Sequence, residues 1–140
     1  MATETPAGKQ PGLAILERFV SAENAHDIDA LAALMADDCR FHGNGTLVAP
    51  TWAAYRPIMA ATLAAFPDSH REVHLRLAQG DLVAFRWTVT ATHQATWNGI
   101  PASGRAVTFT GTSWIRVSDD RIAEAWFDMD IAGPIRQMTN

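Results

Sequence analysis

The spacing at which apolar residues recur along the chain changes near residue 69. Up to that point, apolar residues recur every three or four positions, which predicts amphipathic helices. We expect the first two helices over residues 13–25 and over residues 28–35, the latter behind an Asp27 N-cap. A third is expected over residues 51–66, with Thr51 as its cap, and Pro57 should kink this helix or mark its true start. A short strand over residues 39–42 and a turn over 43–45 separate the second helix from the third.

From residue 69 onward, apolar residues occupy every second position, which predicts β-strands. Strands are expected over residues 71–77, 85–93, 107–117 and 122–130, with a hairpin connection over 97–105 and a short C-terminal segment over 131–138. In the first strand, Val73, Leu75 and Leu77 should share one face. In the two central strands the predominantly apolar face should carry Phe85, Trp87, Val89, Ala91, His93, Val107, Phe109, Gly111, Ser113, Ile115 and Val117.

The opposite face of the central strands carries two rows of threonines. These are Thr88, Thr90 and Thr92 in one strand and Thr108, Thr110 and Thr112 in the other. Threonine suits a strand face that meets either water or another polar sheet. Trp114 and Trp126 fall on the same face, and large exposed aromatic residues indicate an interface. We therefore favour a homodimer through this outer sheet face over a solvated face.

Helices followed by a meander of long strands indicate an α+β protein. We expect a curved antiparallel sheet packed against the N-terminal helices, which together enclose a cone-shaped core. The 140 residues suit one domain, which we place at residues 13–138 behind a flexible tail over residues 1–12.

Composition narrows the classes of partner. The net charge is −4, and Lys9 is the only lysine, so no basic cluster indicates binding to nucleic acid or to an anionic membrane. Cys39 is the only cysteine, which rules out an intramolecular disulfide and any paired-cysteine metal motif. No apolar stretch reaches the ~18 residues of a membrane span. The first residues are polar and unlike a signal peptide. We expect a cytoplasmic protein.

Five segments in order resemble the SnoaL-like polyketide cyclases of the NTF2-like superfamily, over roughly residues 13–138. They are 38–42 (DCRFH), 65–68 (AFPD), 80–87 (GDLVAFRW) followed by Thr92-His93, 99–105 (GIPASGR), and 121–126 (RIAEAW) with Asp130. Gly133 and Gln137 extend the match. The resemblance implies the NTF2-like cone, a deep apolar pocket between sheet and helices, and frequent dimerisation. It also implies acid–base chemistry without a cofactor, namely ring closure of polyketide esters by intramolecular aldol condensation.

The chain departs from that family at the residue used for chemistry. Counted without gaps, the acid/base aspartate of the aromatic polyketide cyclases falls at Phe127, and a pocket histidine falls at Ser113. A slip of one residue would bring Asp128 to the acid position, but it would also send the whole apolar face outward. In related ketosteroid isomerases the base falls at Gly43, and in limonene-type epoxide hydrolases an aspartate falls again at Phe127. Neither of these reactions is therefore supported.

Three residues remain as candidates for proton transfer. His42 and His93 are each interpreted either as structural or as sharing acid and base roles, since neutral imidazole can serve as either near pH 7. Asp130 is interpreted either as a cap of the C-terminal segment or as a group that orients a histidine in the pocket. We adopt His42, His93 and Asp130 as the candidate catalytic set.

The expected ligand is a small hydrophobic or aromatic carbonyl compound. Candidate substrate-binding residues are Trp52, Tyr55, Trp87, Ser113, Phe127 and Met129. No histidine grouping at metal-binding spacing and no phosphate or dinucleotide loop is found, so no metal and no cofactor are expected. Two other hypotheses stay open: a non-catalytic ligand-binding or dimerisation module, which the phenylalanine at position 127 favours, and a hydrolase on the same scaffold.

Overall fold

The computed structural model describes residues 10–140, in which three helices precede most of the strands. The helices are α1 (Pro11–Asn24), α2 (Ile28–Leu34), α3 (Trp52–Ala65) and α4 (Ala132–Thr139). The strands are β1 (Met35–Gly43), β2 (Thr46–Ala49), β3 (His70–Gln79), β4 (Leu82–Thr92), β5 (Ala106–Ser118) and β6 (Arg121–Met129). This arrangement confirms the α+β class. Residues 1–9 of the expected tail lie outside the described residues, and α1 already begins at Pro11.

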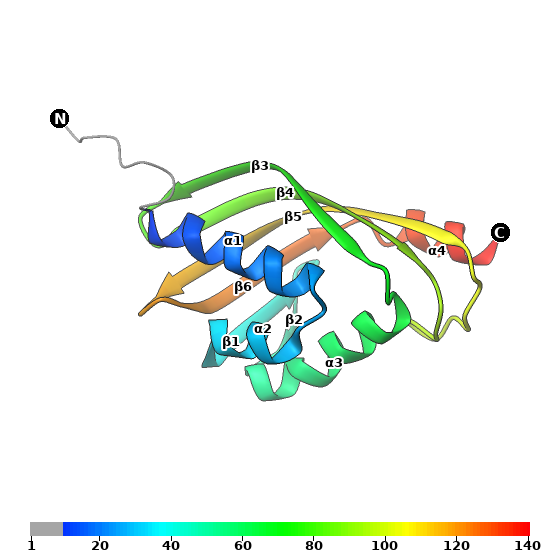
Figure 1. The fold of residues 1–140 in the computed structure, drawn as a ribbon, viewed down its shortest axis with the longest axis horizontal. Coiled ribbons are helices and arrows are strands. Elements are labelled where there is room, and N and C mark those ends of the chain that lie inside the picture. The colour runs from blue at the N-terminus through cyan, green and yellow to red at the C-terminus, as the bar shows by residue number, and fades with distance from the viewer. Residues whose placement is uncertain (1–9) are drawn as a thin grey trace.

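The six strands form one curved sheet in the order β2-β1-β6-β5-β4-β3. Helices α1, α2 and α3 lie on one side of it, while α4 lies beyond the far end of β6 and packs on β5 (Figure 1). The expected sheet was antiparallel throughout, and one pair differs, because β1 runs parallel to β6. Helix α3 and strands β3 to β5 lie between these two strands in sequence, which leaves room for the long crossover that a parallel pair requires.

Two predicted caps begin their helices as expected. Asp27 accepts a hydrogen bond from the Ala30 N–H at 3.0 Å, and Thr51 accepts one from the Ala54 N–H at 3.1 Å. Helix α3 continues past Pro57 to Ala65, so this proline does not mark the start of the helix.

The region between α2 and α3 differs most from the expected elements. Helix α2 ends at Leu34, and the chain is already extended from Met35, four residues before the expected start of the strand. Strand β2 was not expected, because most of it is exposed and its residues show no alternation. Asn44 and Gly45 have φ angles of 48° and 82°, the left-handed conformation that a two-residue hairpin turn requires between β1 and β2.

In strand β3 the structure contradicts the prediction that Val73, Leu75 and Leu77 share one face. Val73 lies opposite Trp87, on the inner side, but the pairing register shifts between Val73 and Leu75. Such a bulge moves all later side chains to the other face of the sheet. Leu75 and Leu77 are therefore 67% and 68% exposed, on the outer side rather than in the core.

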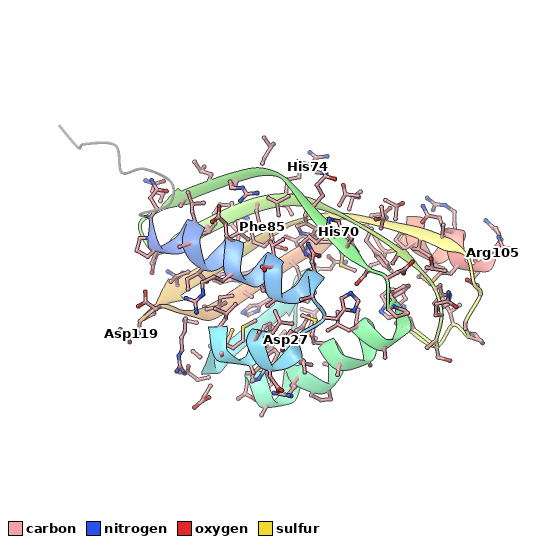
Figure 2. All side chains as sticks on the ribbon, viewed as in Figure 1. Asp27, His70, His74, Phe85, Arg105 and Asp119 are labelled. Carbon is pink, nitrogen blue, oxygen red and sulfur yellow. The ribbon has the colours of Figure 1, made fainter. Side chains whose placement is uncertain are left out.

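Strands β4 and β5 have the expected faces. Their alternate residues are buried towards the helices, as at Phe85, whose ring lies between the sheet and α1, 6.5 Å from the ring of Phe19 (Figure 2). Ser113 points inward and is 7% exposed, while Asp128 is exposed. The inner face of these strands forms one wall of the cavity described below.

Candidate functional site

A cavity of about 440 Å³ lies between the inner face of the sheet and helices α1 and α3. Its volume falls within the range typical of small-molecule sites, roughly 300–1,000 Å³. Aromatic residues dominate its walls, among them Phe19, Phe41, Phe66, Phe85, Trp87, Phe109 and Phe127. The polar residues among its described lining are Glu23, Tyr55, Thr62, Ser69, Arg71, Asn98 and Ser113.

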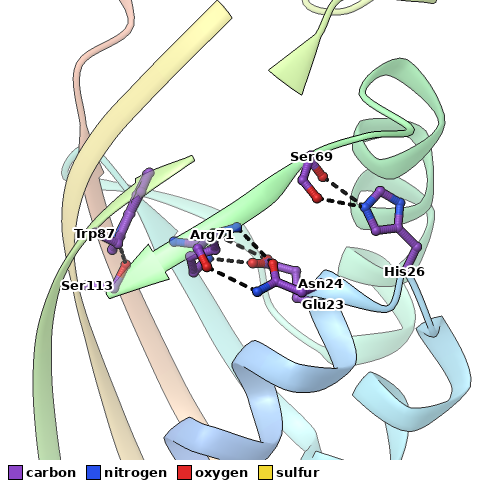
Figure 3. Close-up of polar contacts among 7 residues, drawn as sticks. All are labelled: Glu23, Asn24, His26, Ser69, Arg71, Trp87 and Ser113. Carbon is purple, nitrogen blue, oxygen red and sulfur yellow. Dashed lines mark hydrogen bonds and ion pairs between the residues drawn. The ribbon is translucent and has the colours of Figure 1, made fainter. Parts of the chain in front are cut away.

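An ion pair between Glu23 of α1 and Arg71 of β3 lies in the wall of this cavity. Both side chains are largely buried, at 10% and 14% exposure. Arg71 donates from Nε to Glu23 Oε1 and from Nη2 to Oε2, the second at 3.2 Å, so the guanidinium binds the carboxylate as a fork. The side chain of Asn24 bonds both backbone groups of Arg71, at 2.8 and 3.0 Å (Figure 3). Two residues at the end of α1 thus hold both the backbone and the side chain of Arg71 in place.

The ion pair continues into the sheet through Trp87. The guanidinium carbon of Arg71 lies 4.2 Å from the centre of the Trp87 ring, a cation–π contact. On its edge, Trp87 donates from Nε1 to Ser113 Oγ at 2.9 Å (Figure 3). Because an indole N–H can only donate, Ser113 accepts here and keeps its own hydrogen for another acceptor. A ligand oxygen in the cavity can receive that hydrogen.

Tyr55 supplies a further hydroxyl to the cavity. Its ring stacks on Phe41 with centroids 4.0 Å apart and contacts the Phe127 ring at 6.3 Å. Burial raises the pKa of the Tyr55 hydroxyl well above its usual value, and the negative charge of Glu23 adds to this effect. Tyr55 is therefore neutral at physiological pH and can donate a hydrogen bond.

Five of the six residues expected to bind substrate line the cavity: Tyr55, Trp87, Ser113, Phe127 and Met129. Trp52 is absent from its lining and packs behind the wall, 6.1 Å from the ring of Phe41 and 6.4 Å from that of Tyr55. Whether the five contact a substrate stays a prediction.

His42 lies on the outer side of the sheet. It is paired in register with Trp126, on which its ring stacks with centroids 5.5 Å apart and an interplanar angle of 9°. Its Nε2 lies 2.7 Å from Glu124 Oε2, and Arg40 binds the same oxygen at 3.2 Å. His42 does not line the cavity. Its neighbour Phe41 points inward instead, since adjacent residues of a strand point to opposite faces of the sheet.

His93 is fully buried just beyond the end of β4. The Ser103 N–H donates to His93 Nδ1 at 3.3 Å, and the Ser103 hydroxyl lies 2.9 Å from the same nitrogen. Nδ1 therefore accepts, which assigns the proton of the neutral ring to Nε2. That Nε2 is buried without a hydrogen-bond partner in the described part of the chain and the ring packs against Phe66, 5.6 Å away. His93 does not line the cavity.

Asp130 lies at the start of α4, where its Oδ1 accepts a hydrogen bond from the Gly133 N–H at 3.3 Å. A Cβ added to Gly133 would lie 2.3 Å from Asp130 Oδ2, so a larger residue at this position would require the Asp130 carboxylate to move. Asp130 is exposed and bonds to neither histidine. The structure thus does not bring His42, His93 and Asp130 together, and their role in proton transfer stays a prediction without a shared site.

Sequence reasoning missed the two charged residues of the cavity, although a signal for both existed. Glu23 follows Leu16 and Phe19 at helical spacing, so it continues the apolar stripe of α1. Arg71 shares the parity of Val73 and so falls on the inner face of β3. A charged residue on an apolar face indicates a buried partner, and here each is the partner of the other.

Within residues 10–140, no three His, Cys, Asp or Glu side chains lie close enough to hold a metal ion. In the same part of the chain, no helix has the length and apolar character needed to cross a membrane.

The model of the family described as SnoaL-like polyketide cyclase matches residues 14–138. The chain therefore belongs to the SnoaL-like polyketide cyclase family. No curated protein sequence matches it significantly.

Solved structures of similar proteins include two at 28% identity. AclR, a candidate hydroxylase from Streptomyces galilaeus, aligns with a TM-score of 0.81 over 89% of this chain and 92% of its own. IdmH, a candidate polyketide cyclase from Streptomyces antibioticus, aligns with a TM-score of 0.79 over 94% and 99%. An LEH-like epoxide hydrolase of M. tuberculosis shares the fold at 17% identity, with a TM-score of 0.73 over 91% and 89%.

Proposed function

We propose that the protein binds a small hydrophobic or aromatic carbonyl compound in the cavity and transfers protons on it without a cofactor, as in an intramolecular aldol cyclisation or an isomerisation. The observation that supports this most is an apolar cavity of about 440 Å³ with one carboxylate and several hydrogen-bond donors in its walls. The similarity of the chain to IdmH, a candidate polyketide cyclase, also supports this proposal.

Glu23 is the group we assign as the base. It is the only carboxylate among the described residues that line the cavity, and no histidine lines it. A carboxylate has about four lone-pair positions on its two oxygens, and Arg71 occupies one position on each. The remaining lone pairs can take a proton from the carbon next to a ligand carbonyl.

The resulting enolate oxygen needs donors, because its negative charge would otherwise lie in an apolar cavity. Ser113 retains its hydroxyl hydrogen and Tyr55 is protonated, so both can donate to it. The enolate carbon then attacks a second carbonyl in a cyclase, or is reprotonated elsewhere in an isomerase. In either case the proton held by Glu23 returns to the product, and the reaction balances without an oxidant or reductant.

The test is proton exchange next to a carbonyl. The protein is incubated with 2-tetralone, a small aromatic ketone, in deuterated water, and the loss of the α-proton signals is followed by NMR. General-base catalysis contributes roughly 10²–10⁴-fold, so Glu23→Gln should lower the enzymatic rate by at least about 100-fold. Asp128→Asn removes a carboxylate from the exposed outer face and should retain the wild-type rate. Equal exchange by wild type and Glu23→Gln would refute the assignment.

A non-catalytic binding module is the second candidate, and Phe127 favours it. The ring of this residue lines the cavity where the cyclases are expected to carry their acid. This alternative predicts that 2-tetralone binds but that exchange never rises above the rate in buffer alone.

We further propose that the protein is a homodimer through the outer sheet face. One register row crosses all six strands on that side: Leu47, His42, Trp126, Trp114, Ala84 and Leu77. Within this row, Leu47, Trp114 and Leu77 are 50%, 44% and 68% exposed. Large exposed apolar groups across a sheet are typical of an interface.

A further inference from the structure

We propose that the Glu23–Arg71 pair makes the cavity selective for the carbonyl oxygen of an uncharged ligand and excludes carboxylates. In this assignment Arg71 is the polar anchor that determines specificity, and Glu23 positions and neutralises it. The inference rests on the proposed function of the cavity as a ligand site and specifies which ligands that site accepts.

Arg71 has hydrogen-bond donors left over after it binds Glu23. A guanidinium carries five N–H groups, and the fork to Glu23 uses one from Nε and one from Nη2. Within residues 10–140, no hydrogen-bond acceptor is found for Nη1, and Arg71 lines the cavity. The guanidinium face is covered by Trp87, 4.2 Å away, so the free donors lie at its edge. A ligand oxygen can accept from this edge while Glu23 keeps its own two bonds.

The charge balance decides which kind of oxygen fits. Arg71 is the only cation among the described lining residues, and Glu23 already neutralises it. A ligand carboxylate would compete with Glu23 for the same fork and bring a second negative charge beside it. Both side chains of the pair are at most 14% exposed, so water screens this repulsion poorly. A carbonyl oxygen accepts a hydrogen bond without adding charge.

Trp87 connects this anchor to a second donor. Its ring face contacts Arg71, and its Nε1 holds Ser113 Oγ at 2.9 Å, so the free hydrogen of Ser113 lies on the same wall. A carbonyl oxygen has two lone pairs and can accept from two donors at once. The pairing of two donors with no free cation matches a ketone or ester better than an acid.

Three ligands of nearly equal shape test the selectivity: 2-acetylnaphthalene, 2-naphthoate and 2-ethylnaphthalene. Each is titrated into the protein near neutral pH and followed by calorimetry. We expect wild type to bind the ketone at least about tenfold more tightly than the carboxylate, which corresponds to about 1.4 kcal/mol. It should also bind the ketone more tightly than the ethyl compound, since the hydrocarbon leaves the donors of Arg71 without an acceptor.

Two variants locate the effect. Glu23→Gln leaves Arg71 with an uncompensated charge, so the affinity for 2-naphthoate should rise at least about tenfold, while that for the ketone changes much less. Arg71→Gln should abolish the preference of the ketone over the ethyl compound. Asp128→Asn, on the outer face, should keep the wild-type order. Circular dichroism and thermal unfolding establish that each variant is folded.

The comparison of the three ligands with the wild-type protein tests the inferred selectivity even if a variant does not fold. Tighter binding of 2-naphthoate or of 2-ethylnaphthalene than of the ketone overturns the inference, and so does a folded Glu23→Gln with no gain for 2-naphthoate. In those outcomes the cavity still binds small aromatic compounds, and the exchange of 2-tetralone protons still reports on the proposed function. If none of the three compounds binds to wild type, the inference and the binding function fail together.

Discussion

The ring of Phe127 lies directly over the backbone of Gly43, so that a Cβ added to Gly43 would be 2.5 Å from Phe127 Cε2. These are the two positions at which the resemblance to related enzymes places an acid or a base. In this chain Phe127 is a large apolar ring, and Gly43 has no side chain and so leaves space for that ring. Neither a phenylalanine nor a glycine side chain can transfer a proton, which is why we sought the carboxylate of the cavity elsewhere, on α1.

A first prediction concerns this packed pair. Gly43→Ala should lower the free energy of unfolding by about 1–3 kcal/mol, the usual cost of overpacking. Phe127→Leu shortens the opposing side chain, so in the double variant Gly43→Ala should cost clearly less than in the wild-type background. Urea unfolding of the four proteins measures this coupling. Strictly additive effects would show that the two residues do not share the space.

Tyr55 gives a second prediction, because it is the only tyrosine in the chain. Its pKa is raised above the usual 10.0, chiefly by burial, so the folded state holds this proton more tightly than the unfolded state does. The stabilisation is present below pH 10 and is lost as the pH rises further. Absorbance of tyrosinate should therefore appear only together with unfolding. A normal titration near pH 10 in the folded protein would contradict the burial of this hydroxyl.

Asp68 gives a third prediction, at acid pH. Its carboxylate accepts hydrogen bonds from the N–H and the hydroxyl of Thr92, both at 2.7 Å, and these bonds lower its pKa below the usual 3.8. The folded state thus favours the ionised form, so the stabilisation is present above pH 3.8 and is lost as the pH falls through the lowered pKa. Thermal unfolding between about pH 5 and about pH 2 should show a smaller loss for Asp68→Asn than for wild type. Identical acid profiles would rule out this contribution.

The outer face gives a fourth prediction. Trp114→Glu places a charge among exposed apolar side chains and should convert the proposed homodimer to a monomer, because burying an unpaired charge in an interface is costly. Light scattering after size-exclusion chromatography reports the mass. Ile58→Glu is the matched control, since Ile58 is 42% exposed on α3, away from this face. A monomeric wild type, or a dimer unaffected by Trp114→Glu, would refute the interface.

Strand parity accounts for most of what the sequence could predict. Alternation correctly placed Ser113 and Phe127 towards the helices, because an unbroken strand in a half-buried sheet has only two possible faces. The same rule failed at Leu75, since a bulge after Val73 reverses the parity and leaves no mark in the alternation itself. A bulge depends on the partner strand, which the local sequence does not describe.

The candidate site was predicted less well because it depends on contacts between distant elements. Glu23 and Arg71 are 48 positions apart, and only the packing of α1 on β3 brings them together. His42 was adopted as a candidate for proton transfer, although its neighbour Phe41 takes the inward direction of β1 and leaves His42 on the outer face. A charged residue on an apolar face, as at Arg71, is the signal that would have indicated the polar part of the cavity.

The most direct test of the account is the crystal structure of the protein with 2-acetylnaphthalene bound. We predict that the naphthalene lies among the aromatic walls of the cavity and that its carbonyl oxygen is within hydrogen-bond distance, about 3 Å, of Arg71 Nη1 or Ser113 Oγ. A ligand bound with its carbonyl directed away from Glu23, Arg71 and Ser113, or bound at the outer face of the sheet, would contradict the central claim.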